Sequence, residues 1–320
     1  MTDKNTHIPL VSIGMPVFNG ENFLEEALQS ILAQSFEDYE LIICDNASTD
    51  RTSAICKEYA GRDKRIRYHR HEQNLGAAVN FNSTFALARG PLFKWAAHDD
   101  LLEPDYLEQC VAALDANRDA VLCHSLVRVI DAEGKSLAIY NSDLKGSDSS
   151  SLHKRFAALV LSRHLCTDMF GLIRHSAMAQ TKKHGAYYGG DRSLLAELSL
   201  LGQFITIPTP LFMNREHGQR FVRAVHAADW HAWHDMAKPE RKSAPTWQLY
   251  SDYLRAVGTH VADPRERARC YLILTRWWLV DWNPLRLAVD LISRLNPSIY
   301  DWVRRTKLKI LGKLPQARIR

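Results

Sequence analysis

Strand-like apolar runs alternate with helical stretches through the first hundred residues, and this alternation limits the fold more than any other feature. The runs stand at 10–15, 41–44, 66–69 and 93–97. Between the first two, Phe23, Ala27 and Ile31 recur at the spacing of one helix face. Strands that alternate with helices in this way predict a mainly parallel, doubly wound α/β sheet with right-handed crossovers.

The fourth run ends abruptly in His98, Asp99 and Asp100. In open α/β sheets, the carboxyl ends of parallel strands border the crevice that binds ligands. Two adjacent carboxylates repel each other, and a hard divalent cation that also bridges phosphate oxygens would stabilise both. The alternative interpretation is a helix-capping aspartate beside a solvated acid in a turn.

The middle of the chain continues the mixed pattern. Further strands are expected at 121–130, 135–140, 204–207 and 211–213, with a hairpin turn between the first two. The polar run 141–151 predicts a loop, and the leucine spacing after Asp191 predicts a helix that stops at Gly202. We therefore expect the alternating architecture to extend to about residue 218.

From about Val225 the composition changes, because tryptophans cluster and no further strand that ends in acids is found. This change predicts a helical C-terminal extension. We place an α/β domain at 1–220 and the extension, with its basic tail, at 221–320.

Charge is spread unevenly along the chain. The formal net charge is +5, and residues 304–320 hold seven cations and no acid. Basic residues that gather only in a tail disfavour nucleic-acid recognition. The same tail, which also carries apolar residues, is suited to an anionic membrane surface, and a solvated or oligomer-facing helix is the alternative.

The cysteines and the N-terminus point to a cytoplasmic protein. The six cysteines form no Cys-x-x-Cys pair, which indicates free thiols in a reducing compartment. Residues 1–7 are polar and lack the apolar core of a signal peptide, and no run of about 18 uncharged apolar residues occurs. We expect a cytoplasmic location, with the basic tail allowing peripheral contact with the inner face of the membrane.

Five short motifs in order resemble the signature of family 2 glycosyltransferases of the GT-A fold, over roughly residues 8–218. The motifs are Pro16-x-Phe18-Asn19, Asp45-Asn46-x-Ser48-x-Asp50, Asn74-x-Gly76, His98-Asp99-Asp100 and Gly190-Asp191. Each motif alone is weakly specific, whereas five in this order are specific. The resemblance implies a Rossmann-like GT-A domain that acts on a nucleoside diphosphate sugar.

The resemblance implies that the first two motifs bind the nucleotide. The loop of Pro16, Phe18 and Asn19 would flank the base and ribose, and Asp45 would accept a hydrogen bond from the base. A carboxylate suits uracil and thymine, which each present a ring N–H donor, so a UDP- or dTDP-sugar is favoured. By its residue type alone, Asp45 is also a common cap.

Two positions in the second motif depart from the family pattern. The family usually has a second acid at Asn46 and glycine at Ala47.

Arg67 and the Asn74–Gly76 loop lie where the family's third strand and the following loop approach the donor. Gly76 would permit close approach of the backbone, and the next helix could support a phosphate at its N-terminus. Asn-x-Gly is otherwise a common turn.

The resemblance places a divalent cation, Mn²⁺ or Mg²⁺, at the fourth strand. Asp100 would bind the metal, and Asp99 would hold the ribose or the water shell of the metal. His98 stands where the family often has aspartate, and an imidazole ligand favours Mn²⁺; a bystander role is the alternative. His217 matches a position that supplies a metal ligand or a diphosphate contact in some GT-A enzymes, and Arg215 could pair with phosphate.

Asp191 matches the catalytic base of the family, which removes the proton of the acceptor hydroxyl during in-line attack. A helix cap is the alternative, and both can hold together. The implied reaction is inverting transfer to a hydroxyl of a polysaccharide, lipopolysaccharide or glycolipid. The rival hypothesis is a catalytically silent nucleotide-sugar-binding or scaffold subunit of a glycan assembly complex, and oligomers fit either hypothesis.

Two other enzyme classes lack the loop they require. A dinucleotide-dependent oxidoreductase needs Gly-x-Gly-x-x-Gly after the first strand, and a sugar nucleotidyltransferase needs a glycine-rich, basic loop there. The chain has Pro16-Val17-Phe18-Asn19 at that place.

Overall fold

The computed structural model of the chain describes residues 7–218, 244–280 and 283–295. The strands are β1 (Val11–Val17), β2 (Tyr39–Asp45), β3 (Ile66–Arg70), β4 (Leu92–Trp95), β5 (Leu101–Leu102), β6 (Ala120–Ile130), β7 (Ser136–Tyr140), β8 (Leu172–Arg174) and β9 (Gln203–Arg215). The helices of the α/β part are α1 (Leu24–Leu32), α2 (Thr52–Arg62), α3 (Ala77–Ala86), α4 (Tyr106–Ala116), α5 (Leu152–Leu161), α6 (His175–Gln180) and α7 (Gly190–Leu201), with a short 3₁₀ helix at Thr167–Phe170. The helices after the α/β part are α10 (Pro245–His260), α11 (Pro264–Trp277) and α12 (Asn283–Leu295).

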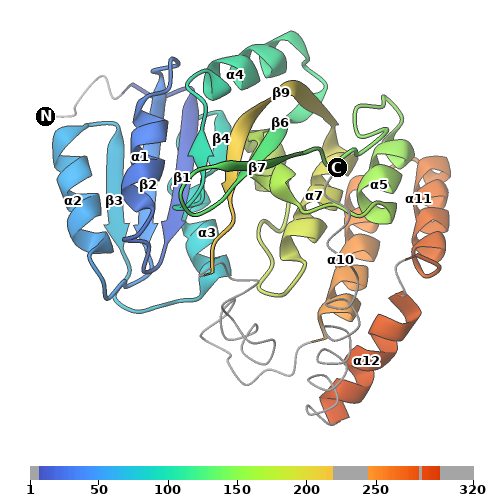
Figure 1. The fold of residues 1–320 in the computed structure, drawn as a ribbon. Coiled ribbons are helices and arrows are strands. Elements are labelled where there is room, and N and C mark those ends of the chain that lie inside the picture. Colours follow the sequence, from blue (N-terminus) through green and yellow to red (C-terminus); the bar gives the residue numbers. More distant parts are fainter. Residues whose placement is uncertain (1–6, 219–243, 281–282, 296–320) are drawn as a thin grey trace, which may run out of the picture.

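One nine-stranded sheet runs through the molecule in the order β3-β2-β1-β4-β8-β6-β9-β5, and β7 pairs with β6 (Figure 1). The first four strands in this order are parallel, so β1 to β4 deliver their carboxyl ends to one edge. The other half is mixed, because β8 is antiparallel to both β4 and β6, whereas β9 is parallel to β6. The predicted α/β class is confirmed, and the parallel pattern holds for the N-terminal half.

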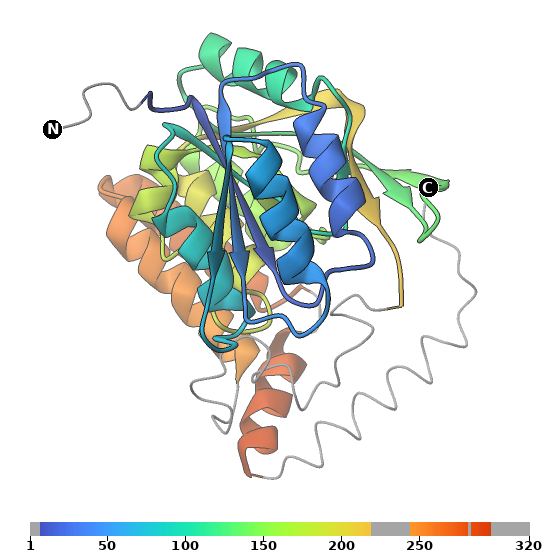
Figure 2. The ribbon, with the colours of Figure 1, turned by 90° about the vertical axis from the view of Figure 1, so that its left-hand side faces the viewer.

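The parallel half is buried on both faces, which explains its continuous apolar runs. Every residue of β1 and β2 is buried. Helices α1 and α2 cover one face, and α3 covers the other by packing against β1 and β2 (Figure 2).

The two late strands expected at 204–207 and 211–213 are one bent strand, β9. Its pairing with β6 shifts register between Ile207 and Pro210. Proline cannot donate to a ladder and is tolerated at bulges, so Pro208 and Pro210 bend the strand without ending it. This bend lets the end of β9 pair with β5, directly after the acids that follow β4. The predicted hairpin of β6 and β7 is confirmed.

The C-terminal helices share a hydrophobic core with the sheet. Helix α10 packs against α7, and α11 packs against α5 (Figure 1). Tyr253 and Trp277 belong to the same buried cluster as Phe93 and Trp95 of the sheet region. The predicted extension is therefore helical and continuous with the core, whereas the predicted boundary at 220 lies outside the described residues.

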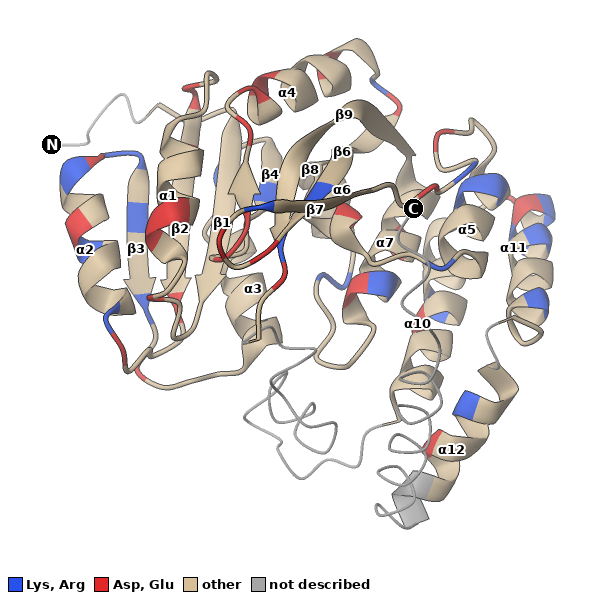
Figure 3. Ribbon diagram, viewed as in Figure 1, with Lys and Arg blue, Asp and Glu red and all other residues tan. Residues whose placement is uncertain are grey.

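Arginine also gathers on α11, which the sequence interpretation overlooked. This helix carries Arg265, Arg267, Arg269 and Arg276 with one acid, Glu266 (Figure 3). The basic tail at 304–320 lies outside the described residues. The six cysteines are free and buried, as expected. No helix within the described ranges combines the length and the apolar character needed to cross a membrane.

Candidate active site

The loops that leave β1 and β2 are bonded to each other at the carboxyl edge of the parallel half. The Asn19 amide donates to Ser48 Oγ at 3.0 Å, and the Thr49 amide donates to Asn19 Oδ1 at 2.8 Å. Asn19 takes a left-handed conformation with φ of 51°, which asparagine tolerates better than most residues. Pro16 lies within β1, whereas the Phe18 side chain is 41% exposed at this edge. The role of Phe18 beside the base stays a prediction.

Asp45 is fully buried at the end of β2 and accepts hydrogen bonds from its own chain. The Ser48 amide donates to Oδ1 at 2.8 Å, and the Tyr68 hydroxyl donates to Oδ2 at 2.7 Å. Arg70 Nε lies 3.3 Å from Oδ2. A carboxylate has about four acceptor positions, so contact with a base must share this carboxylate with Tyr68 and Arg70. The role of Asp45 in base binding stays a prediction.

Asn46 ties the β2 loop to the loop before α3. Its amide nitrogen donates to Asn74 Oδ1 at 2.9 Å, and its oxygen accepts from the Leu75 amide at 2.9 Å. A carboxylate cannot donate, so this reciprocal pair explains the departure from an acid at Asn46. Gly76 has φ of 87° and Ala47 has φ of 62°, so both occupy the left-handed region where glycine is least strained.

The structure does not bring Arg67 to this edge, which corrects the prediction. Arg67 is the second residue of β3, and its Nη1 donates to Glu40 Oε2 at 2.7 Å. Ser12 and Arg89 also donate to Glu40. Burial would raise the pKa of Glu40, but hydrogen bonds from Arg89, Ser12 and Arg67 bring it below its usual value. Arg67 therefore belongs to a network around the buried Glu40, and Arg70, at the end of the strand, lies at the edge instead.

The acids after β4 are held by the end of β9. Asp100 accepts from Asn214 Nδ2 at 3.0 and 3.1 Å and from the Arg215 amide at 2.8 Å. Asp99 Oδ2 lies 2.8 Å from His217 Nε2. Asp100 is buried and Asp99 is partly buried. Two segments more than a hundred residues apart thus meet where the parallel strands end.

Arg215 anchors this junction and is not available to phosphate, contrary to the sequence hypothesis. Its guanidinium is fully buried and lies 4.8 Å from the Phe23 ring centroid. Nη2 donates to Glu26 Oε2 at 2.7 Å, and Nη1 donates to the Ala132 carbonyl at 2.8 Å. Nε donates to the Asp99 carbonyl at 2.9 Å. These three segments enclose the side chain in the interior, which residue type alone does not reveal.

The predicted metal ligands do not form one three-ligand group. Within the described residues, no three His, Cys, Asp or Glu side chains lie close enough to hold a metal ion by themselves. His98 packs on Gly20, where an added Cβ would stand 2.6 Å from His98 Cδ2. His217 Nδ1 is buried and has no hydrogen-bond partner in the described part.

These residues nevertheless fit a divalent cation that the substrate helps to bind. Mg²⁺ is usually held by one or two carboxylates together with substrate phosphates and water. Asp99 and Asp100 supply the carboxylates, and the imidazole of His217, if its unpaired nitrogen turns toward the ion, suits Mn²⁺.

Asp191 stands in the first turn of α7 and is partly buried. Burial lowers the pKa of His184, and the charge of Asp191 offsets part of this shift. The His184 ring stacks on Phe81 at 5.0 Å and meets Trp95, the last residue of β4, at 6.3 Å. The position of Asp191 relative to the acids after β4 in a donor complex stays a prediction. Gly190 must lack a Cβ, because one would overlap the Gly185 carbonyl.

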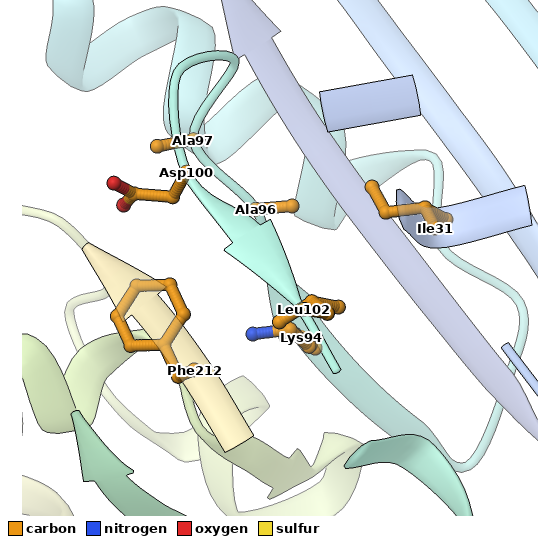
Figure 4. Close-up of a pocket in the computed structure, with 7 residues that line it drawn as sticks. All are labelled: Ile31, Lys94, Ala96, Ala97, Asp100, Leu102 and Phe212. Atoms are coloured by element: carbon orange, nitrogen blue, oxygen red, sulfur yellow. The ribbon is translucent and has the colours of Figure 1, made fainter. Parts of the chain in front are cut away.

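Lys94 is a site residue to which the sequence analysis gave no role. It lies fully buried on β4, donates to the Phe170 carbonyl, and stands 4.6 Å from the Tyr106 ring centroid. Burial lowers the pKa of Lys94 to about 8, and the Cys110 thiol and the charge of Asp100 oppose this shift. Lys94 and Asp100 line the same small pocket (Figure 4). A lysine inside an apolar strand was the only sequence signal.

Solved structures of glycosyltransferases share this fold. The Staphylococcus aureus TarS fragment 1–349 in complex with UDP-GlcNAc superposes with a TM-score of 0.61 at 16% identity, over 83% of this chain and 71% of that one. A mannosyltransferase of Pyrobaculum calidifontis, in complex with GDP-Man and Mn²⁺, superposes with a TM-score of 0.54 at 17% identity, over 95% and 81%. At these identities the likeness establishes the fold.

Relatives with similar sequences are described as uncharacterized glycosyltransferases. One from Haemophilus influenzae is 25% identical over 259 residues, or 79% of this chain and 77% of that protein. One from Rickettsia typhi is 32% identical over 166 residues and spans 51% of each chain. The chain thus covers about half the length of the Rickettsia typhi relative.

The sequence model of the family described as "Glycosyl transferase family 2" matches residues 12–180, which is just over half of the chain. The matched stretch contains the first four of the five motifs, and it ends before Gly190-Asp191 and the end of β9. The chain belongs to glycosyltransferase family 2.

Proposed function

We propose that this protein transfers a sugar from a nucleoside diphosphate donor to a hydroxyl acceptor, with inversion at the anomeric carbon. The observation that carries the proposal is the junction of Asp99 and Asp100 with the end of β9, at the carboxyl edge of parallel strands. Ligands of open α/β sheets bind at such edges. Neighbours of the same fold hold UDP-GlcNAc or GDP-Man with Mn²⁺, which supports the proposal.

The donor would lie across the bonded loops at the ends of β1 and β2. Phe18 and Asn19 flank the base and ribose, and Asp45 accepts from the base, which favours UDP- or dTDP-sugars. Asn74 and Gly76 shape the loop beside the diphosphate. A divalent cation at Asp99 and Asp100, when bound, neutralises the diphosphate and improves it as a leaving group.

Asp191 is the proposed base of the reaction. The acceptor oxygen attacks the anomeric carbon from the face opposite the diphosphate, and its proton passes to the Asp191 carboxylate. A new carbon–oxygen bond forms as the bond to the diphosphate oxygen breaks, and the nucleoside diphosphate leaves with that electron pair. One displacement inverts the anomeric carbon, and a positioned base contributes about 10²–10⁴-fold to such a step.

The proposed acceptor is a growing polysaccharide, a lipopolysaccharide or a glycolipid. The proposed location is the cytoplasm, with peripheral contact at the inner face of the membrane. Support comes from the basic residues of the tail and of α11, since cations near an anionic surface each contribute about 1 kcal/mol to its binding.

A thermal-shift panel of UDP, GDP, CMP and dTDP, each with and without Mn²⁺, tests the donor site. A ligand at a hundred times its Kd stabilises the folded state by about 2.7 kcal/mol. We expect one diphosphate to raise Tm in a metal-dependent way, and Asp99→Asn to remove the metal dependence. Asp38→Asn, an exposed acid before β2, is the matched control and should keep the full response.

Two results would contradict the proposal. No response to any of the four nucleotides would remove the donor site. A metal-dependent response without any sugar transfer or donor hydrolysis would favour the silent scaffold subunit.

A further inference from the structure

The loop that leads to Asp191, residues 181–189, is held from two sides. On the α3 side, the His184 amide donates to Asn82 Oδ1 at 3.0 Å, and Asn82 Nδ2 donates to the His184 carbonyl at 3.0 Å. This reciprocal pair fixes the backbone of His184 to the helix that covers the donor half of the sheet. The loop then turns back at Gly189, whose φ is 101°.

On the other side, the loop is held by helix α10 of the C-terminal extension. The Tyr187 hydroxyl donates to Asp252 Oδ2 at 2.7 Å, and Lys182 Nζ donates to Asp252 Oδ1 at 3.0 Å. Arg255, one turn further along α10, also donates to Oδ1 at 3.1 Å. Asp252 and Tyr187 are both buried. A single carboxylate from the extension therefore binds both ends of the loop.

A second acid strengthens the same connection. Glu197 of α7 accepts from the Lys182 amide at 2.9 Å, and His260, the last residue of α10, lies 3.0 Å from its other oxygen. Glu197 is buried, so these contacts are shielded from water. The start of the loop, α7, and the middle and C-terminal end of α10 are thus joined in one polar network.

We propose that helix α10 is a positioning element for the proposed base, and that Asp252 sets the place of Asp191 by holding Tyr187. This inference rests on the proposed function. Tyr187 stands four residues before Asp191, and the Gly190 amide donates to the Tyr187 carbonyl at 3.0 Å. The first turn of α7 therefore begins on the residue that Asp252 holds. The proposed role of Asp252 and Tyr187 involves no contact with the reacting atoms.

The contact should affect turnover more than donor binding. A displacement of about 1 Å at a reacting group can reduce a rate by about a hundredfold. The donor side is built from the loops after β1 and β2, which are bonded to each other and to the loop before α3. Losing the Asp252–Tyr187 contact should therefore lower kcat and leave the KM of the donor unchanged.

The test uses Tyr187→Phe and Asp252→Ala in the full chain. Turnover is followed as release of nucleoside diphosphate from UDP-GlcNAc or GDP-mannose, whichever raises the wild-type Tm. We expect kcat to fall about tenfold or more for both variants, with an unchanged donor KM. Asp263→Ala is the matched control, because Asp263 caps α11 of the same extension through the Arg265 and Glu266 amides and is not part of the network. It should lower Tm without lowering kcat at temperatures below its transition.

Hydrogen exchange of residues 182–191 gives a readout that does not need activity. Exchange should become faster in Asp252→Ala and Tyr187→Phe, and stay at the wild-type rate in Asp263→Ala. Unchanged exchange, or full kcat in both network variants, would overturn the inference. If the wild type released no diphosphate, the proposed function would fail, and faster exchange in the network variants would still support the positioning contact.

Discussion

The donor side and the base side of the candidate site are supported in different ways. The donor side is braced by contacts among the loops of the parallel half, such as those of Asn19 with Ser48 and of Asn46 with Asn74, and by the end of β9. The base side depends on partners from distant elements, Asn82 of α3 and Asp252 of α10. The comparison suggests that donor binding is a property of the sheet, whereas turnover also needs the C-terminal helices.

Replacing the proposed base should give the largest effect, because it should lower turnover and leave donor binding unchanged. Asp191→Asn keeps the size of the side chain and can still accept from the Arg192 amide, as Asp191 does at 2.7 Å. We expect turnover to fall about 10³-fold and the Tm increase caused by the nucleotide to remain. Comparable turnover in this variant would remove Asp191 from the mechanism.

Loss of the Arg215 anchor at the junction of β9 with the acids after β4 should destabilise the fold. Arg215→Met leaves the carbonyls of Asp99 and Ala132 without their buried donor, and we expect a loss of about 2–4 kcal/mol in the free energy of unfolding. Chemical denaturation measures this loss. Glu26→Gln is the control, because the Glu26 side chain is 55% exposed and its ion pair should contribute less than about 1 kcal/mol. Equal effects of the two substitutions would show that the carbonyl contacts contribute little.

The buried Lys94, which lines a pocket together with Asp100, should lower the free energy of unfolding. Its buried ammonium has no carboxylate in hydrogen-bond contact among the described residues. Lys94→Met should therefore stabilise the fold at pH 7 by about 1–3 kcal/mol, because the Phe170 carbonyl keeps the Tyr106 hydroxyl as donor. A destabilised variant in urea denaturation would show that the amine is well solvated by its surroundings.

The difference in stability between the wild type and Lys94→Met should depend on pH. The pKa of Lys94 is about 8 in the folded state, below the usual 10.5. Between these values the unfolded chain binds more protons than the folded one, so the stability of the wild type rises with pH relative to Lys94→Met. The advantage of the variant should be complete below pH 8 and vanish by about pH 10.5. A constant difference from pH 7 to pH 10.5 would contradict the lowered pKa.

The smallest expected effect concerns the strained turn after β2. Ala47 has φ of 62° where the family usually has glycine. Ala47→Gly relieves about 1 kcal/mol of left-handed strain and adds entropy to the unfolded chain, for a net gain of about 0.5 kcal/mol. Urea midpoints of the two proteins measure it, and a loss of stability would mean that the Ala47 methyl group makes useful contacts.

The same comparison explains what the sequence could predict. The acids after β4 and the loops after β1 and β2 follow directly from local motifs, since each comes at the end of an apolar strand. Arg67 was misplaced because the strand register sets it opposite Ile42, where it reaches Glu40 and not the edge. Arg215 was misplaced because the groups that surround it, Asp99, Ala132 and Glu26, come from distant parts of the chain.

The base side was less accessible to sequence reasoning for a physical reason. Asp191 was proposed from its motif, but Asp252 lies 65 residues after Tyr187 and no local pattern relates them. Lys94 is similar, because its neighbours come from α4, β9 and the 3₁₀ helix. Long-range burial decides such roles, and only the folded chain shows it.

The most direct test of the central claim is time-resolved ¹H NMR of donor hydrolysis with Mn²⁺, using UDP-GlcNAc or GDP-mannose, whichever raises Tm. Both sugars are α-linked in the donor, so one in-line displacement predicts that the β anomer of the free sugar appears first, before it equilibrates in water. This signal should need Mn²⁺ and disappear in Asp191→Asn. First appearance of the α anomer would contradict the inverting mechanism, and donor binding without any hydrolysis or transfer would contradict the assignment as an enzyme.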